Sequence, residues 1–284
     1  MIDFKQRGVV ITGAASGIGE ALAQALAAQG ARLLLADVDA PRLEAVAKTL
    51  QAKGASCEWQ IADVASRAAL QALADRAQAL WGGADVLINN AGVGLVAPVA
   101  SLIEADARWL MDINFWGVAN GCQVFLPQLK ARPQALIVNV SSVFAMISMP
   151  TQSIYNAAKA AVRAYSDALR EELSDTPVRL LCVHPGGIQT RIVEQARLGD
   201  ISAVADSPEA LRSQFAQQAR TTPAQAAAVI INAMQRGDRR VLIGIDARLG
   251  DALFRLVPSR ASAWFTALAR WQRKRLAASG PRTG

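Results

Sequence analysis

The chain has 284 residues, of which 52% are hydrophobic and 19% charged, and this balance supplies enough apolar side chains for a large folded core. General disorder is therefore excluded. The three cysteines, Cys57, Cys122 and Cys182, form no CxxC pair and no disulfide framework, which fits a reducing compartment. The lone histidine, His184, excludes sites that need two histidines, so we expect no metal site and a hydrogen-bonded strand-end role for His184.

The formal net charge of +7 is concentrated near the carboxyl-terminal end. Residues 236–284 hold eleven Lys or Arg against three Asp or Glu, a net charge of +8, which leaves −1 for the rest. A nucleic-acid-binding protein is expected to carry its basic face on the main fold, so no nucleic-acid partner is predicted. The sequence carries neither a recognisable secretory signal nor a long uncharged apolar run, and we expect a cytoplasmic protein.

Short runs rich in leucine and β-branched residues alternate with longer alanine-rich runs. Gly30 and Gly54 follow two of the helical runs, and Ser66 is a candidate N-cap residue. The strand-like runs are hydrophobic throughout, which is typical of strands buried on both faces. The sequence therefore predicts an α/β Rossmann fold in one domain, with a doubly wound, seven-stranded parallel sheet. The predicted strands are 8–12, 32–36, 57–62, 85–89, 135–140, 178–184 and 239–244, and the clearest helices are 17–29, 41–53, 66–81 and 153–173.

Two segments depart from this alternation. Residues 187–222 contain no predicted strand, and loops of that length in compact domains are usually functional, so we expect a lid over the substrate. The dinucleotide-binding and catalytic domain is expected over 1–245, followed by a basic helical extension over 246–284.

The extension contains two predicted helices, at about 246–257 and 261–276. In the second, Trp264, Leu268 and Trp271 share one face, beside basic residues on other faces. This amphipathic helix either packs on the body of the protein or on a second subunit, or it contacts an anionic membrane surface.

A glycine-rich turn follows the first predicted strand and opens a helix. Glycines allow a tight turn and close approach of the backbone, and a helix N-terminus offers free N–H groups to a pyrophosphate. The turn is thus a candidate site for a dinucleotide. Its candidate contact residues are Gly13, Ser16, Gly17, Ile18 and Gly19.

Asp37 stands at the end of the second predicted strand, where a carboxylate can accept hydrogen bonds from ribose hydroxyls. A 2′-phosphate beside Asp37 would meet like charge, and Ser16 and Val38 offer no compensating arginine. The sequence therefore favours NAD(H) over NADP(H).

Tyr155 and Lys159 are four residues apart, and so they lie on one face of a predicted helix. An adjacent ammonium favours the phenolate, and we expect it to lower the phenol pKa toward the working range. Tyr155 is then a candidate acid/base that exchanges a proton with a substrate oxygen.

Five motifs in this order resemble the short-chain dehydrogenase/reductase family, over about residues 5–245. They are Thr12–Gly19, Asn89-Asn90-Ala91-Gly92, Ser142, Tyr155-x-x-x-Lys159 and Pro185-Gly186-x-x-x-Thr190.

The resemblance implies roles for further residues. It implies that Ser142 orients the substrate, that Lys159 also binds the nicotinamide ribose, and that Asn114 holds a water on the proton path. Asp63 is equally well explained as a cap of the next helix. Homodimers or homotetramers are also usual in the family. The remaining cofactor contacts implied are Asp63 and Val64 at the adenine, Asn90, Ala91 and Gly92 along the dinucleotide, and Pro185, Gly186, Ile188 and Thr190 at the nicotinamide.

Few charged residues are expected to face the substrate, so we predict a hydrophobic secondary alcohol or ketone. The chain is thus expected to be an NAD(P)-dependent oxidoreductase that favours NAD(H). An NADPH-dependent carbonyl reductase and a non-catalytic dinucleotide-binding regulator are the alternatives. The expected substrate-facing residues, which could equally be core residues, are Leu95, Val96, Val143, Phe144, Met146, Ile147, Met149, Ile192 and Val193.

Overall fold

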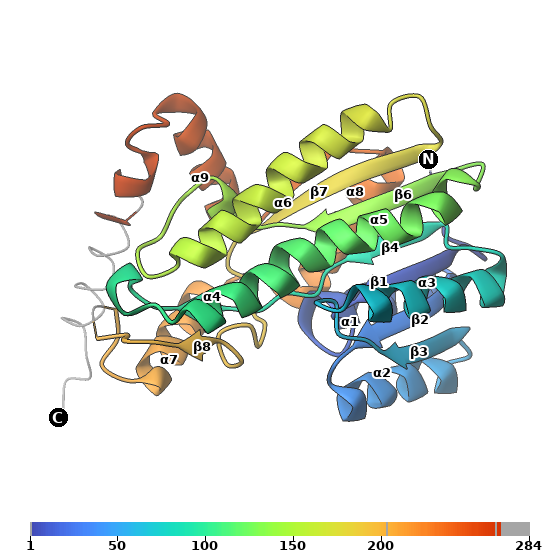
Figure 1. Cartoon of the computed structure of the whole chain (residues 1–284), viewed down its shortest axis with the longest axis horizontal. Helices are drawn as coiled ribbons and strands as arrows, with labels where there is room; N and C mark the ends of the chain where they lie inside the picture. Colours follow the sequence, from blue (N-terminus) through green and yellow to red (C-terminus); the bar gives the residue numbers. More distant parts are fainter. Residues whose placement is uncertain (1, 203, 265, 268–284) are drawn as a thin grey trace.

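The computed structural model describes residues 2–202, 204–264 and 266–267, and in these residues a seven-stranded parallel sheet carries helices on both faces (Figure 1). This confirms the predicted fold class, and each strand lies within one or two residues of its predicted position. The strands are β1 (Gly8–Thr12), β2 (Arg32–Asp37), β3 (Cys57–Ile61), β4 (Val86–Asn89), β6 (Ala135–Val140), β7 (Val178–Pro185) and β9 (Arg240–Ile243).

The strands are arranged in the order β3-β2-β1-β4-β6-β7-β9. The chain moves outward from β1 to β3, then returns to the centre and places β4 on the other side of β1. Parallel α/β sheets bind ligands outside the carboxyl ends of the strands where the order reverses in this way.

Helices α1, α2 and α8 cover one face of the sheet, and α3, α5 and α6 cover the other. Alternate residues of β1 enter the two cores: Val9 and Ile11 pack with α1 and α8, whereas Val10 packs with α3 and α5. Burial on both faces explains why the strands read as continuous apolar runs. The helices are α1 (Gly17–Ala28), α2 (Ala40–Ala52), α3 (Arg67–Trp81), α4 (Glu104–Met111), α5 (Gly117–Lys130), α6 (Ser153–Glu172), α7 (Pro208–Gln218), α8 (Pro223–Arg236) and α9 (Ile245–Leu256).

The helix boundary signals act as predicted. Ser66 caps α3, because its Oγ accepts a hydrogen bond of 3.3 Å from Ala69 N. Gly30 and Gly54 follow α1 and α2 with φ of 78° and 83°, a left-handed conformation that suits glycine.

The prediction that 187–222 lacks a strand was wrong. A short strand, β8 (Arg197–Leu198), pairs in parallel with β5 (Leu95–Val96), and α7 follows in the same segment. Two residues give no hydrophobic run, so the strand had no sequence signal. Figure 1 shows α7, β8 and α9 at the end of the molecule opposite the amino terminus.

Helix α9 packs on the main body, where Ala247 and Gly250 are buried against the segment after β6. The following helical residues are 261–264 and 266–267, and Trp264 remains half exposed. Leu268 and Trp271, the other residues of the predicted amphipathic stripe, lie outside the described part of the chain. No helix among the described residues is both long and apolar enough to cross a membrane.

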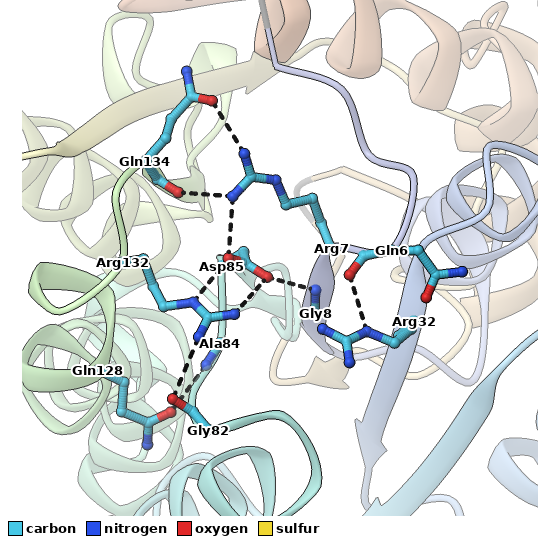
Figure 2. Close-up of polar contacts among 10 residues, drawn as sticks. All are labelled: Gln6, Arg7, Gly8, Arg32, Gly82, Ala84, Asp85, Gln128, Arg132 and Gln134. Carbon is cyan, nitrogen blue, oxygen red and sulfur yellow. Dashed lines mark hydrogen bonds and ion pairs between the residues drawn. The ribbon is translucent and has the colours of Figure 1, made fainter.

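A polar cluster centred on Asp85 joins the amino ends of β1 and β4 (Figure 2). The Asp85 carboxylate accepts a hydrogen bond of 2.8 Å from Gly8 N and forms ion pairs with Arg132 and Arg7 at 2.9 and 3.2 Å. Burial alone would raise the pKa of Asp85, but the hydrogen bonds and positive charges outweigh burial and lower it. The cluster is structural, since it lies at the end of the sheet away from the cavity described below.

Candidate active site

One cavity of about 1520 Å³ lies at the carboxyl ends of the strands, where the strand order reverses. It collects residues from the turns after six strands, β1, β2, β3, β4, β6 and β7, as well as from α6, α7 and α9. Gly19 and Asn114 are the two predicted site residues that do not line it. The predicted residues that do are Gly13, Ser16, Gly17, Ile18, Asp37, Asp63, Val64, Asn90, Ala91, Gly92, Ser142, Tyr155, Lys159, Pro185, Gly186, Ile188 and Thr190.

The glycine turn after β1 cannot accept side chains at two of its positions. Gly13 has φ of 65°, and a Cβ built on it would lie 2.7 Å from Ala91 Cα. A Cβ on Gly19 would lie 2.1 Å from Gly13 O. Since both clashes are with backbone, only glycine fits, and Gly19 supports the turn from beneath the cavity.

Asn90 ties this turn to the end of β4. Its Nδ2 donates hydrogen bonds of 3.0 Å to both Thr12 O and Gly13 O, while Thr12 Oγ1 accepts from Asn90 N and Ala91 N. The two loops that face the cavity therefore hold each other in place.

The start of α1 fits a phosphate group. Its N-cap residue, Ser16, accepts no hydrogen bond from the first turn, whereas the N-cap side chains Asp39 of α2 and Ser66 of α3 do. The first N–H groups of a helix need external acceptors, and the helix dipole favours an anion there. A dinucleotide pyrophosphate provides such an acceptor.

Asp37 is fixed at the rim of the same cavity. Its Oδ2 accepts a hydrogen bond of 3.0 Å from Ala15 N, and its Oδ1 accepts one of 3.0 Å from Asp39 N. The neighbouring side chain, Val38, is exposed. The described residues bring two carboxylates and no arginine from this loop to the cavity.

Ser142, Tyr155 and Lys159 converge at the opposite end. Ser142 Oγ accepts a hydrogen bond of 3.1 Å from Phe144 N, and its interaction with the Tyr155 hydroxyl favours a lower pKa for Tyr155. Lys159 Nζ lies 5.8 Å from the centre of the Tyr155 ring and donates a hydrogen bond of 3.0 Å to Val140 O. The lysine is therefore anchored to the end of β6, beneath the tyrosine ring.

Burial governs the protonation of this pair, contrary to the expectation of a lowered phenol pKa. Part of the Tyr155 ring faces the cavity, but the surrounding protein excludes water from it and raises the pKa of Tyr155 to about 12. Burial also lowers the pKa of Lys159 to about 8. The Lys159 ammonium, 5.8 Å from the centre of the ring, does not offset the desolvation of the phenol.

Asn114 sits in a π-helical segment, Asp112–Trp116, and is fully buried. Its amide exchanges two hydrogen bonds with the backbone of Val93, at 2.8 and 2.9 Å. A Cβ on Gly92 would lie 3.2 Å from Asn114 Oδ1 and 3.4 Å from Lys159 Nζ. Asn114 therefore lies behind the cavity wall, and both it and Lys159 lie close to Gly92.

The structure places the remaining predicted residues around these groups. Asp63 holds the turn before α3, since its Oδ1 accepts a hydrogen bond of 2.9 Å from Ala65 N. Thr190 reaches back to the glycine turn, and its methyl would lie 3.0 Å from a Cβ on Gly17. His184 is fully buried, with Nδ1 3.2 Å from Ser142 O, and burial lowers its pKa to about 4.

The substrate end of the cavity is mainly apolar. Met146 and Ile147 do not line it, because they are buried beneath α9. Sequence reasoning missed Asp246 and several apolar residues, since α7 and α9 carry no motif. The predicted residues that line this end are Leu95, Val96, Val143, Phe144, Met149, Ile192 and Val193, and the missed ones are Leu211, Phe215, Ile245, Asp246, Leu249, Leu253 and Trp264.

The candidate dinucleotide site at the glycine turn and the cluster of Ser142, Tyr155 and Lys159 line the same cavity. Together they define an oxidoreductase-type site. A family model for short chain dehydrogenases matches residues 7–200, and the chain belongs to that family. It is an NAD(P)-dependent oxidoreductase that acts on CH–OH donors.

Two relatives illustrate the sequence similarity. A Mycobacterium tuberculosis protein named "Putative oxidoreductase SadH" is 39% identical over 262 residues, which cover 91% of this chain and 94% of that protein. The Escherichia coli oxidoreductase UcpA is 33% identical over 215 residues, covering 75% and 79% of the two chains.

Two solved structures share the fold and were determined with dinucleotides. A Burkholderia phymatum short-chain dehydrogenase/reductase in complex with NAD has a TM-score of 0.80 at 30% identity, covering 90% of this chain and 96% of its own. A Thermococcus sibiricus alcohol dehydrogenase complexed with 5-hydroxy-NADP has a TM-score of 0.72 at 25% identity, covering 84% and 96%.

Proposed function

We propose that this protein interconverts a hydrophobic secondary alcohol and its ketone, with NAD(H) as the favoured cofactor. The observation that carries the proposal is the convergence of Ser142, Tyr155 and Lys159 on one cavity with the glycine turn and Asp37. When bound, the dinucleotide supplies or accepts a hydride at its nicotinamide ring. A substrate panel followed by NADH absorbance tests the activity. No turnover of any alcohol or ketone would count against it.

Tyr155 moves the proton in this proposal. With a pKa raised to about 12, the phenol is protonated at neutral pH and is ready to donate to the oxygen of a ketone. In the reverse direction the phenolate accepts the proton of the alcohol. The Ser142 hydroxyl interacts with Tyr155 and holds the same substrate oxygen.

Lys159 and Asn114 support that transfer. Lys159 has a pKa lowered to about 8, so its ammonium can release and regain a proton near neutral pH. Asn114, across Gly92 from the lysine, continues the polar path away from the cavity. Lys159 also faces the cavity that would receive the nicotinamide ribose.

Asp37 carries the preference for NAD(H). Its two carboxylate oxygens already face backbone N–H groups, which fixes the negative charge at the rim where the adenosine ribose would lie. A 2′-phosphate there meets like charge from Asp37 and from the adjacent Asp39. Dissociation constants for NADH and NADPH test this, and tighter binding of NADPH would instead favour the alternative of an NADPH-dependent carbonyl reductase.

The apolar walls support a bulky, uncharged substrate. Leu95, Val143 and Phe144 form one side, and α9 contributes Leu249 and Leu253 on another. Burying apolar substrate surface against them yields about 25 cal/mol per Å². Bulky alicyclic alcohols should therefore give higher kcat/KM than small polar alcohols, and the opposite order would refute this substrate class.

Residues 187–222 serve as the lid over this substrate. Arg197 in β8 forms an ion pair of 2.6 Å with Asp106 of α4, and its guanidinium lies 3.9 Å from the centre of the Trp109 ring. These contacts hold the lid in place across the cavity.

We also propose that the protein forms a homodimer or homotetramer, and that its carboxyl-terminal helix contacts a membrane. Analytical ultracentrifugation tests the first, and liposome co-sedimentation with and without residues 251–284 tests the second.

A further inference from the structure

The carboxylate of Asp246 lies directly against the turn that follows β7. Asp246 belongs to the first turn of α9, and its Oδ2 accepts a hydrogen bond of 2.6 Å from Gly187 N. A Cβ on Gly186 would lie 2.2 Å from Oδ2, and one on Gly244 would lie 2.3 Å from Oδ1. The carboxylate therefore occupies space that exists only because both positions are glycine.

Asp246 has no cationic partner among residues 2–202, 204–264 and 266–267, although it lines the cavity. The basic side chains that line the same cavity are engaged elsewhere or exposed. Lys159 donates to Val140 O, and Arg220 is exposed. Arg191 is paired through Nε with Glu194 at 2.8 Å, while its buried Nη1 makes no hydrogen bond to a described residue. An aspartate carboxylate is negatively charged at neutral pH. Its field in the cavity is thus not cancelled by an ion pair.

We infer that Asp246 selects the redox form of the dinucleotide by favouring the oxidised one. The inference rests on the proposed function, in which the turn Pro185–Thr190 receives the nicotinamide end. The oxidised nicotinamide ring carries a positive charge that the reduced ring lacks. A carboxylate held against this turn attracts the charged ring and leaves the neutral ring unaffected, and the attraction is strong where water is scarce.

Fluorescence titration for NADH and calorimetry for NAD⁺ measure this selection as a ratio of dissociation constants. Asp246→Asn removes the charge and keeps the shape of the side chain. Asp246→Ser also removes the charge, and its shorter side chain keeps an oxygen. The matched control is Asp39→Asn, which removes a carboxylate from the other end of the same cavity and leaves a good cap for α2.

Both Asp246 variants should raise the ratio of the NAD⁺ to the NADH dissociation constant by about fivefold, a shift expected for one nearby charge. Asp39→Asn should leave the ratio within about twofold, since the adenosine half is identical in the two forms. The inference is overturned if the ratio stays unchanged in the folded Asp246 variants, or if it moves equally in Asp39→Asn. Wild-type protein that binds neither dinucleotide would instead overturn the proposed function. Circular dichroism identifies which variants are folded, and one folded Asp246 variant is enough for the test.

Discussion

Replacing Lys159 by methionine should stabilise the fold while removing activity. Lys159 is 3% exposed, and burial lowers its pKa from 10.5 to about 8. Because one pKa unit corresponds to about 1.4 kcal/mol, holding the ammonium in the folded protein costs about 3 kcal/mol at pH 7. Methionine has a similar length and no charge. It loses the hydrogen bond to Val140 O, worth about 1 kcal/mol.

The net gain for Lys159→Met is thus about 2 kcal/mol in the free energy of unfolding at pH 7. For a chain of 284 residues the unfolding entropy is about 0.6 kcal/mol per kelvin, so Tm should rise by about 3 °C. Calorimetry or urea denaturation measures the change. The exposed Lys53→Met is the matched control and should change stability by less than about 0.5 kcal/mol.

The stability difference between Lys159→Met and wild type should depend on pH in a defined direction. The folded pKa of Lys159 is lowered, so between about pH 8 and 10.5 the unfolded chain holds more protons and wild-type stability rises with pH. The advantage of Lys159→Met is therefore full below pH 8 and disappears near pH 10.5. A methionine variant that is less stable than wild type at pH 7, or a difference that stays constant up to pH 10.5, would refute the role of desolvation.

Three further changes have defined outcomes. Tyr155→Phe should lower kcat by about 10²–10⁴ because the proton donor is lost, with the NADH dissociation constant changed less than about twofold in fluorescence titration. Asp85→Asn should cost about 2–3 kcal/mol in urea denaturation at pH 7, because Arg7 and Arg132 lose the carboxylate with which both form ion pairs. Its effect should shrink as pH falls below about 4, since folding lowers the pKa of Asp85, so that its contribution is full above the unfolded pKa and is lost as pH falls through the folded pKa. Arg197→Ala should expose 187–222 to limited proteolysis while Tm changes by less than about 2 °C, since only the contacts to Asp106 and Trp109 are lost.

A specific result would contradict each of these three predictions. A Tyr155→Phe enzyme with most of its activity would remove the phenol from proton transfer. An Asp85→Asn protein as stable as wild type would mean that the cluster in Figure 2 contributes no net stability. If the Arg197→Ala protein is cleaved at the wild-type rate, β8 is held by its backbone pairing with β5 rather than by the arginine.

The sheet was predictable because its strands are buried on both faces, so that runs such as 8–12 and 135–140 stand out from the amphipathic helices around them. The glycine turn after β1 was also predictable from local sequence, since a Cβ at Gly13 or Gly19 would clash with backbone atoms. Such steric requirements restrict neighbouring positions of the chain to glycine, and so they are visible in the sequence.

The features that sequence analysis missed depend on contacts between distant residues. Asp246 meets Gly187 across 59 positions, and no local pattern marks either residue as part of one site. The pair of Tyr155 and Lys159 was predictable from helical spacing, but the depth of burial that raises one pKa and lowers the other follows only from the assembled cavity.

A crystal structure of the protein with NAD⁺ and a bulky alcohol would test the proposed site most directly. It should place the phosphates on the first turn of α1, and the nicotinamide ring between the turn Pro185–Gly187 and the hydroxyl of Tyr155. The substrate oxygen should lie within hydrogen-bond distance of Tyr155 and Ser142. A nicotinamide ring remote from Tyr155, or phosphates bound away from α1, would contradict the arrangement.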